Sequence, residues 1–190
     1  MKRKAKDKDG SRKKAHTEST NELGNVERRY WLMKAEPESR MEKGKEVKFS
    51  IDDLCAQKTS PWDGVRSHAA KRHMEAMHVG DLGFFYHSNC KTPGIAGVLK
   101  VTREAYPDHT AWDPAHPYYD AKSDAQDPKW WMVDVGYVRH LPNFMPLKTL
   151  KANSNLLDMA MLKQSRLSVS PVRQSEWDLI LSLAEEDQAS

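Results

Sequence analysis

A polar triplet, His87, Ser88 and Asn89, follows three consecutive aromatic residues in the stretch "FFYHSN". Each of these side chains can donate or accept a hydrogen bond. At the end of an apolar strand, such a group could be a catalytic dyad, part of a metal site, the rim of a ligand pocket, or a turn. Adjacent residues on a strand point to opposite faces, so His87 and Ser88 do not make a catalytic pair.

Spacing argues against metal and nucleophilic sites. His68, His73 and His78 recur every five residues, which turns each by roughly 140° from the last on a helix, so they cannot share one face. The sequence contains no HExxH or GxSxG motif, and neither Cys55 nor Cys90 has a nearby ligand partner. We therefore predict no metal ion, no cofactor and no catalytic residue.

A ligand pocket is the remaining possibility, and the segment "PWDGVRSH" offers groups that suit one. It lies just before a predicted helix, whose first turn exposes free backbone N–H groups. Gly64 would let a ligand approach the backbone closely. Trp62 has two interpretations, a core residue or a stacking platform, and its place between Pro61 and Asp63 in a predicted loop favours the platform.

A short apolar strand is predicted at 30–35, where Pro37 then ends it. Lys34 and Glu36 stand at the end of this strand. They could contact a ligand in the same pocket, or they could form a surface ion pair.

The aromatic stretch itself is predicted to be a strand, "DLGFFYH", in a hairpin with "KTPGIAGVLKV" through a Pro-Gly turn. Alternation along the strand directs Phe84 and Tyr86 to one side of the sheet, and Phe85 and His87 to the other.

Helices are predicted where caps and a 3.6-residue period coincide. One short helix begins at Ser50, with Asp53 in capping-box position, and the last helix begins at Ser175, with Asp178 in that position. A third helix precedes Gly80, and its apolar stripe consists of Ala70, Met74 and Met77.

The rest of the chain adds a loop and two strands. A long segment rich in proline and aspartate, 105–129, is predicted to be irregular. The half-buried strand "WWMVDVGYV" follows, and later the strand "RLSVSPV", which Pro171 ends. Five or so mostly antiparallel strands with scattered short helices predict an α+β fold built as a small barrel.

Charge divides the 190-residue chain into two parts. Residues 1–29 carry a net charge of +5 and the remainder carries −2. The polar tail is predicted to be disordered, whereas the folded part has no general affinity for phosphate. The tail holds two basic clusters, which predict a nuclear import signal or a basic arm on nucleic acid. These clusters contain Lys2, Arg3, Lys4, Arg12, Lys13 and Lys14. No apolar run approaches the ~18 residues of a membrane span.

Several stretches, in this order, resemble the EVE domain family of the PUA-like superfamily. They are "YWLMKAEP", "WDGVRSHAA", "GDLGFFYHSNCKTPGIAGVLKV", "KWWMVDVGYV" and "MLKQSRLSVSPV". The resemblance implies one EVE domain at 30–187, a pseudo-β-barrel of about five or six strands with flanking short helices. In one departure, Ala35 stands where the family more often has the serine of an SEP turn.

The resemblance also implies a nuclear, non-catalytic reader that binds DNA containing modified cytosine, either 5-methyl or oxidised. The base would be flipped into an aromatic and polar pocket, where Trp62 stacks on it and Glu36 accepts from its N4 amine. Ser88 and Asn89 would contact the flipped nucleotide or its phosphate. The expected ligand contacts are Lys34, Glu36, Trp62, Asp63, Gly64, Val65, Arg66, Ser67, Tyr86, His87, Ser88, Asn89, Trp130, Arg166 and Ser168.

Three alternatives to this function stay open. The same pocket could bind modified RNA bases, as related YTH domains do. An enzyme acting on a flipped base would need a carboxylate or lysine at the sugar, for which Asp63 and Lys34 are the candidates. An adaptor for other proteins would use the Pro/Asp-rich loop. In each case we expect a monomer.

Overall fold

The computed structural model describes residues 28–186. The import clusters predicted in the tail lie outside these residues, as does residue 187, the predicted end of the domain. Arg29, which the sequence assigned to the tail, donates its backbone N–H to Asp81 Oδ1 at 3.1 Å. Among the described residues, no helix is both long and apolar enough to cross a membrane.

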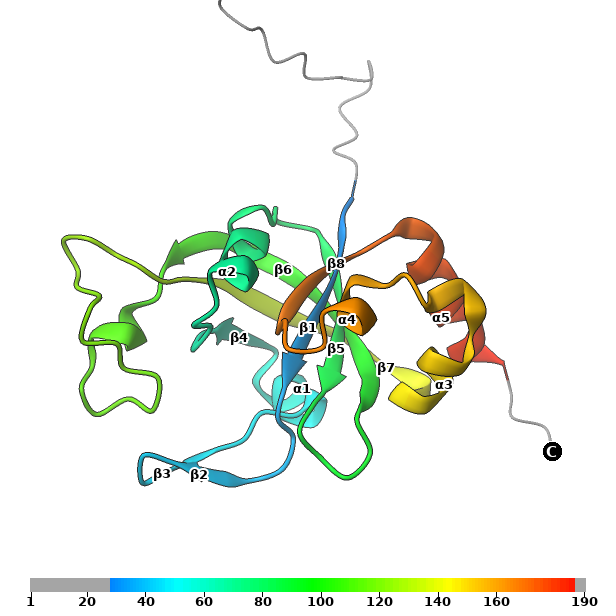
Figure 1. Cartoon of the computed structure of the whole chain (residues 1–190), viewed down its shortest axis with the longest axis horizontal. Helices are drawn as coiled ribbons and strands as arrows, with labels where there is room; N and C mark the ends of the chain where they lie inside the picture. Colours follow the sequence, from blue (N-terminus) through cyan, green and yellow to red (C-terminus); the bar gives the residue numbers. More distant parts are fainter. Residues whose placement is uncertain (1–27, 187–190) are drawn as a thin grey trace, which may run out of the picture.

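Six strands form one mixed sheet in the order β4-β7-β6-β5-β1-β8 (Figure 1). They are β1 Tyr30–Ala35, β4 Thr59–Trp62, β5 Leu82–His87, β6 Gly94–Pro107, β7 Trp131–Pro146 and β8 Val169–Val172. Neighbouring strands are antiparallel except β1 and β5, which are parallel. The α+β class and the strand number are confirmed, while the edge strands β4 and β8 leave the sheet unclosed.

Short helices cover the two sides of this sheet. They are α1 Ile51–Gln57, α2 His68–Glu75, η1 His109–Trp112, α3 Leu147–Ala152, η2 Ser154–Leu156, α4 Ala160–Lys163 and α5 Gln174–Glu185. As predicted, α1 begins with a capping box in which Ser50 caps Asp53 N and Asp53 accepts from Ser50 N. The segment 105–129 is largely irregular, apart from the end of β6 and η1.

Two cores lie on opposite sides of the sheet, and the alternation of β5 separates them as predicted. The core on the face that α1 and α2 cover, the open face, includes Ile51, Leu54, Trp62, Ala70, Met74 and Phe85. The core on the face that α3, α4 and α5 cover, the closed face, includes Phe84, Tyr86, Leu150, Leu156, Met161 and Trp177. Helices α1 and α2 therefore pack on one face of the sheet, and α3, α4 and α5 pack on the other.

Two predicted strand limits are wrong, and proline explains both. The Trp62 segment is not a loop but strand β4, in which Pro61 pairs with Asp134 of β7. Pro171 does not end β8, because it pairs with Trp31 within the strand. Proline lacks the N–H that a ladder uses, so it is tolerated on edge strands, and β4 and β8 are both edges.

Two predicted helix limits are also wrong. The capping pair of α5 is not Ser175 and Asp178 but Arg173 and Glu176, since Glu176 Oε2 accepts from Arg173 N at 2.8 Å. Helix α2 ends at Glu75, so Met77, although buried, lies beyond it.

A small hairpin outside the main sheet was not predicted. Strands β2 (Arg40–Glu42) and β3 (Lys45–Val47) pair with each other as a separate two-stranded sheet. The turn residues Lys43 and Gly44 have φ angles of 47° and 78°. Positive φ at both positions is typical of a tight type I′ turn. In Figure 1 this hairpin projects from the body at the lower left.

Candidate nucleic-acid interface

A cavity of about 350 Å³ opens where β1 ends. Its walls come from the end of β1, the β2–β3 hairpin with the segment after it, β4, and the irregular loop around Tyr118. Its size is at the lower end of the ~300–1,000 Å³ typical of ligand pockets. Four of the predicted contacts line it, namely Lys34, Glu36, Trp62 and Asp63. Among the lining residues that the sequence did not indicate are Glu46, Lys48, Phe49, His116 and Tyr118.

Aromatic rings form one wall of the cavity. Trp62 is only 6% exposed, and it meets Phe49 and Phe85 edge-on with ring centroids 5.8 Å and 5.4 Å away. Trp62 is therefore not the exposed loop platform that the sequence suggested. It is a core residue whose remaining surface borders the cavity.

Arg40 organises the carboxylate side of the cavity. It forms an ion pair with Glu36 and another with Glu42, and its Nη2 donates to the Tyr118 hydroxyl at 3.3 Å. Hydrogen bonds to Glu36 and then Glu42 hold the pKa of Arg40 above its ordinary value. Glu36 also accepts from Asn89 Nδ2 at 3.2 Å. The charge of Glu36 is thus already compensated, and Arg40 fixes its orientation toward the cavity.

Asp63 and Lys34 have perturbed pKa values. Asp63 opens to the cavity, yet desolvation and then the carboxylate of Asp108 raise its pKa. Desolvation lowers the pKa of Lys34, whose Nζ donates to the Ser165 carbonyl at 2.7 Å and lies 5.7 Å from the Tyr86 ring centroid. Perturbed groups that share a cavity are typical of functional sites.

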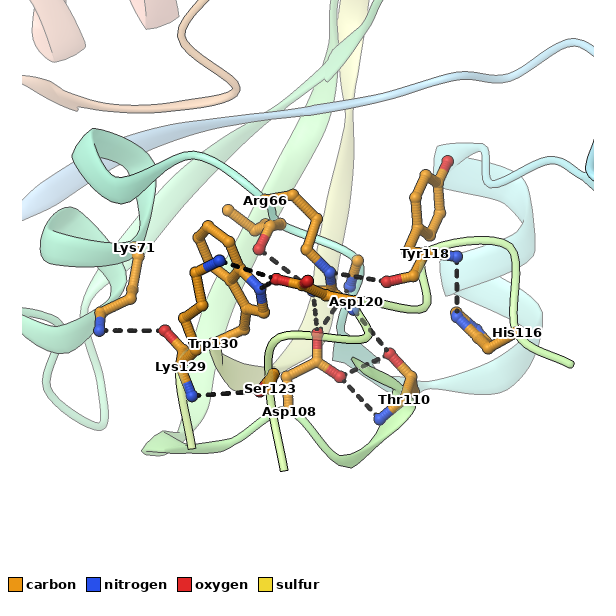
Figure 2. Close-up of polar contacts among 12 residues, drawn as sticks. Arg66, Lys71, Asp108, Thr110, His116, Tyr118, Asp120, Ser123, Lys129 and Trp130 are labelled. Carbon is orange, nitrogen blue, oxygen red and sulfur yellow. Dashed lines mark hydrogen bonds and ion pairs between the residues drawn. The ribbon is translucent and has the colours of Figure 1, made fainter. Parts of the chain in front are cut away.

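A buried ion pair anchors the irregular loop that closes the cavity, as Figure 2 shows. Arg66 donates to Asp108 Oδ2 through Nη1 and to the Tyr118 carbonyl through Nε, both at 2.7 Å. The Asp108 side chain has no exposed surface. Burial alone would raise its pKa, but hydrogen bonds from Thr110 and Arg66 hold it below its ordinary value. The role of Arg66 in this structure is to hold the loop.

Gly64 is required beside this ion pair. Its φ is +73°, and a Cβ there would lie 2.6 Å from Tyr118 Cδ2. The group that approaches the Gly64 backbone is therefore the Tyr118 ring.

Trp130 is a second anchor of the loop (Figure 2). Its Nε1 donates to Asp120 Oδ2 at 2.7 Å, and its ring stacks on His68 of α2 with centroids 4.8 Å apart. Trp130 and Arg66 thus do not line the cavity. They connect the irregular loop to α2 and to the residues just before it.

The polar triplet lies beside the cavity. His87 Nε2 accepts from Ile51 N at 3.1 Å, and Ser88 Oγ donates to the Ala35 carbonyl at 3.1 Å. Desolvation lowers the pKa of His87, which favours the neutral ring that this contact needs. Asn89 does not line the cavity, but it donates a hydrogen bond to Glu36, which does. The triplet therefore connects α1 to the end of β1, and holds the residues that line the cavity without lining it itself.

Two more of the predicted contacts, Ser67 and Arg166, line a second hollow of about 410 Å³, together with Lys163, Gln164, Ser165 and Leu167. Lys34 connects the two hollows, because it lines the first and binds the Ser165 carbonyl. Its backbone N–H also donates to the Ser168 carbonyl at 2.9 Å. Val65 and Tyr86 are buried.

Comparison with known proteins gives the family. The model of the EVE domain matches residues 29–183. Mouse thymocyte nuclear protein 1 is 51% identical over 166 residues, which cover 82% of this chain and 74% of that protein. An uncharacterized protein of Schizosaccharomyces pombe is 39% identical, over 85% of this chain and 70% of its own length.

Solved structures agree with the sequence matches. A crystal structure of human THYN1 in complex with DNA containing 5-methylcytosine has a TM-score of 0.82 and 49% identity, covering 84% of this chain and 99% of that one. The DUF55 domain of human thymocyte nuclear protein 1 has a TM-score of 0.80 and 49% identity, covering 83% and 99%. With the family model matching nearly the whole described domain, this chain belongs to the EVE domain family.

Proposed function

We propose that this protein is a non-catalytic, monomeric reader that binds DNA containing modified cytosine and holds the flipped base in the cavity beside β1. One observation carries the proposal. Human THYN1, 49% identical over 84% of this chain, crystallised in complex with DNA containing 5-methylcytosine. The related chains share the fold over nearly their whole length, which supports the same ligand class here.

The chemistry of the cavity suits a cytosine. A base that is inspected on all edges must leave the stack, and a pocket with aromatic walls and a few polar groups can receive it. Trp62 and Phe49 supply the aromatic wall. Cytosine presents an N4 amine that donates and an N3 that accepts. In its protonated form, Asp63 can donate to N3 and accept from N4, and desolvation and then Asp108 raise its pKa.

The contacts of Lys34 support binding rather than catalysis. A lysine that attacks a sugar must present a free amine. Here the Lys34 ammonium donates to the Ser165 carbonyl and lies over the Tyr86 ring. These contacts hold the Lys34 side chain between the two hollows, where it could meet a phosphate of the bound strand.

We also propose that the protein acts in the nucleus. The relatives are named thymocyte nuclear protein 1, and the tail of this chain carries two basic clusters. Fluorescence microscopy of a chain lacking residues 1–14 tests the import signal. We expect loss of nuclear accumulation, and unchanged accumulation would contradict an import role for these clusters.

Competition binding tests the ligand. A labelled duplex with one 5-methylcytosine is displaced by unlabelled duplexes that carry cytosine or its 5-methyl, 5-hydroxymethyl or 5-formyl form, and by RNA with methyladenine. Burying one methyl group contributes about 0.8 kcal/mol, so we expect 5-methylcytosine to compete about fourfold better than cytosine. Equal competition by cytosine would refute the proposal. Stronger competition by the RNA would show that the ligand of the cavity is a modified RNA base.

A pair of variants assigns binding of the base to the cavity. Asp63→Ala removes the cavity carboxyl that would contact N3 and N4, so it should weaken binding of the modified duplex. Asp178→Ala removes an exposed carboxyl that accepts hydrogen bonds from Gln174 on α5, and should leave that affinity unchanged. Equal behaviour of the two variants would place the base elsewhere.

A further inference from the structure

The β2–β3 hairpin stands beside the cavity mouth as a small separate arm. Its residues Glu46 and Val47 line the cavity. Arg40 ties it to the domain through Glu36 and the Tyr118 hydroxyl. The hairpin thus has a fixed position relative to any base in the cavity, although it is outside the main sheet.

Met41 is an exposed apolar residue on this arm. Its exposed fraction is 66%, the highest among the large hydrophobic residues of the described chain. Met41 is paired with Glu46 across the hairpin, so their side chains lie on the same face, with Cβ atoms about 5 Å apart. Alternation along β2 directs Met41 to the face opposite Arg40, whose side chain reaches Glu36 and Tyr118 at the cavity. Met41 is therefore an exposed methionine on the outer face of an arm that borders the cavity mouth.

The tip of the arm is suited to a phosphate backbone. Lys43 and Lys45 are exposed, and neither forms an ion pair with another residue among 28–186. The tight turn at Lys43 and Gly44 keeps the tip narrow. A narrow arm beside the cavity mouth, with lysines at its end and an exposed apolar side chain, has the features of an element that enters a groove of DNA.

Extruding a base leaves an empty place in the stack, and the lost stacking is part of the energetic cost of extrusion. Proteins that unstack DNA often insert an apolar side chain, methionine included, at the disrupted step. A methionine side chain is unbranched and polarizable, so it adapts to irregular gaps. We propose that Met41 enters the duplex and fills the place vacated by the flipped cytosine. This inference rests on the proposed function of the cavity.

The test compares duplex and single-stranded DNA. A single strand has no stack opposite the base, so a side chain that fills a gap contributes only to duplex binding. We expect Met41→Ala to bind a duplex with one 5-methylcytosine about tenfold more weakly, and to bind the same strand alone within about twofold of the parent. Met41→Leu should retain most of the duplex affinity.

Val79→Ala is the matched control. Val79 is similarly exposed, at 61%, but it precedes β5 at the end of that strand remote from His87 and the cavity. Its truncation should change neither affinity. Melting temperatures of all three variants should match the parent, because both side chains are exposed.

A fluorescent base gives a second readout. With 2-aminopurine next to the 5-methylcytosine, the parent protein should raise its fluorescence by unstacking the step, and Met41→Ala should raise it less. Parental duplex affinity in Met41→Ala, or an equal loss on duplex and single strand, would overturn the role of Met41 while leaving the cavity proposal intact. A parent protein that binds none of these oligonucleotides would overturn both.

Discussion

Trp177 and Trp62 lie on opposite faces of the same sheet and are almost equally buried, at 4% and 6% exposure. Trp177 is stacked on Phe84 at 4.1 Å and on Tyr30 at 4.5 Å, in the core that α3, α4 and α5 cover. Trp62 meets its neighbours edge-on and borders the cavity. The two residues therefore differ not in burial but in the elements that cover them. Helices cover the face that holds Trp177, whereas a hairpin and an irregular loop leave a cavity beside Trp62.

The largest effect should come from the closed face. Trp177→Ala removes a ring that is packed on both sides, so we expect a loss of ~3–5 kcal/mol in the free energy of unfolding. Binding to modified DNA should be retained wherever the variant is folded, because Trp177 is remote from the cavity. Chemical denaturation with parallel binding assays measures both quantities. A selective loss of binding would show that the two faces are coupled.

Trp62→Ala should affect both quantities at once. The ring contacts the core, so stability should fall by about 3 kcal/mol, the low end for such truncations because one side of Trp62 already borders a cavity. Affinity for the modified duplex should fall by a further ~1–3 kcal/mol at a temperature where the variant is folded. Calorimetry and fluorescence anisotropy on the same sample separate these losses. Unchanged affinity in the folded variant would remove Trp62 from the site.

The pH dependence of binding probes Asp63 on the open face. Its folded-state pKa is raised, so its protonated form is favoured below that pKa and is lost as pH rises through it. Affinity for cytosine should therefore fall with rising pH. Asp63→Asn carries the same donor and acceptor at every pH, so it should bind well and show a flatter profile. An equally steep profile in Asp63→Asn would assign the pH dependence to another group.

The smallest effect concerns the closed face again. Ser170 on β8 is fully buried, and its hydroxyl makes no hydrogen bond within the described chain. A buried hydroxyl without a partner is destabilising, so Ser170→Ala should stabilise the protein by about 0.5–1 kcal/mol. Thermal denaturation measures the shift, with binding unchanged. A loss of stability would show that the hydroxyl has a partner in solution.

Local sequence patterns predicted the closed face well. Alternation in β5 placed Phe84 on this face and Phe85 on the other. These patterns report which side chains avoid water, which is what a closed core requires.

The open face was harder to predict, because long-range contacts build it. Arg40 meets Tyr118, and Arg66 meets Asp108, across segments with no periodicity. The resemblance to a family indicated Lys34, Glu36, Trp62 and Asp63, which do share the cavity. It could not show that Arg66 and Trp130 would anchor a loop, since that depends on where Asp108 and Asp120 lie.

The position of β1 between β5 and β8 has a consequence for synthesis. Tyr30, at the start of the domain, pairs with Val172, near its end. During translation β1 can join β5 early, but its other edge stays open until β8 leaves the ribosome. Pairings so distant in the chain slow folding and expose a strand edge meanwhile. A transcript that ends before Val169 would therefore yield a chain with an unprotected β1, prone to pair with other nascent chains.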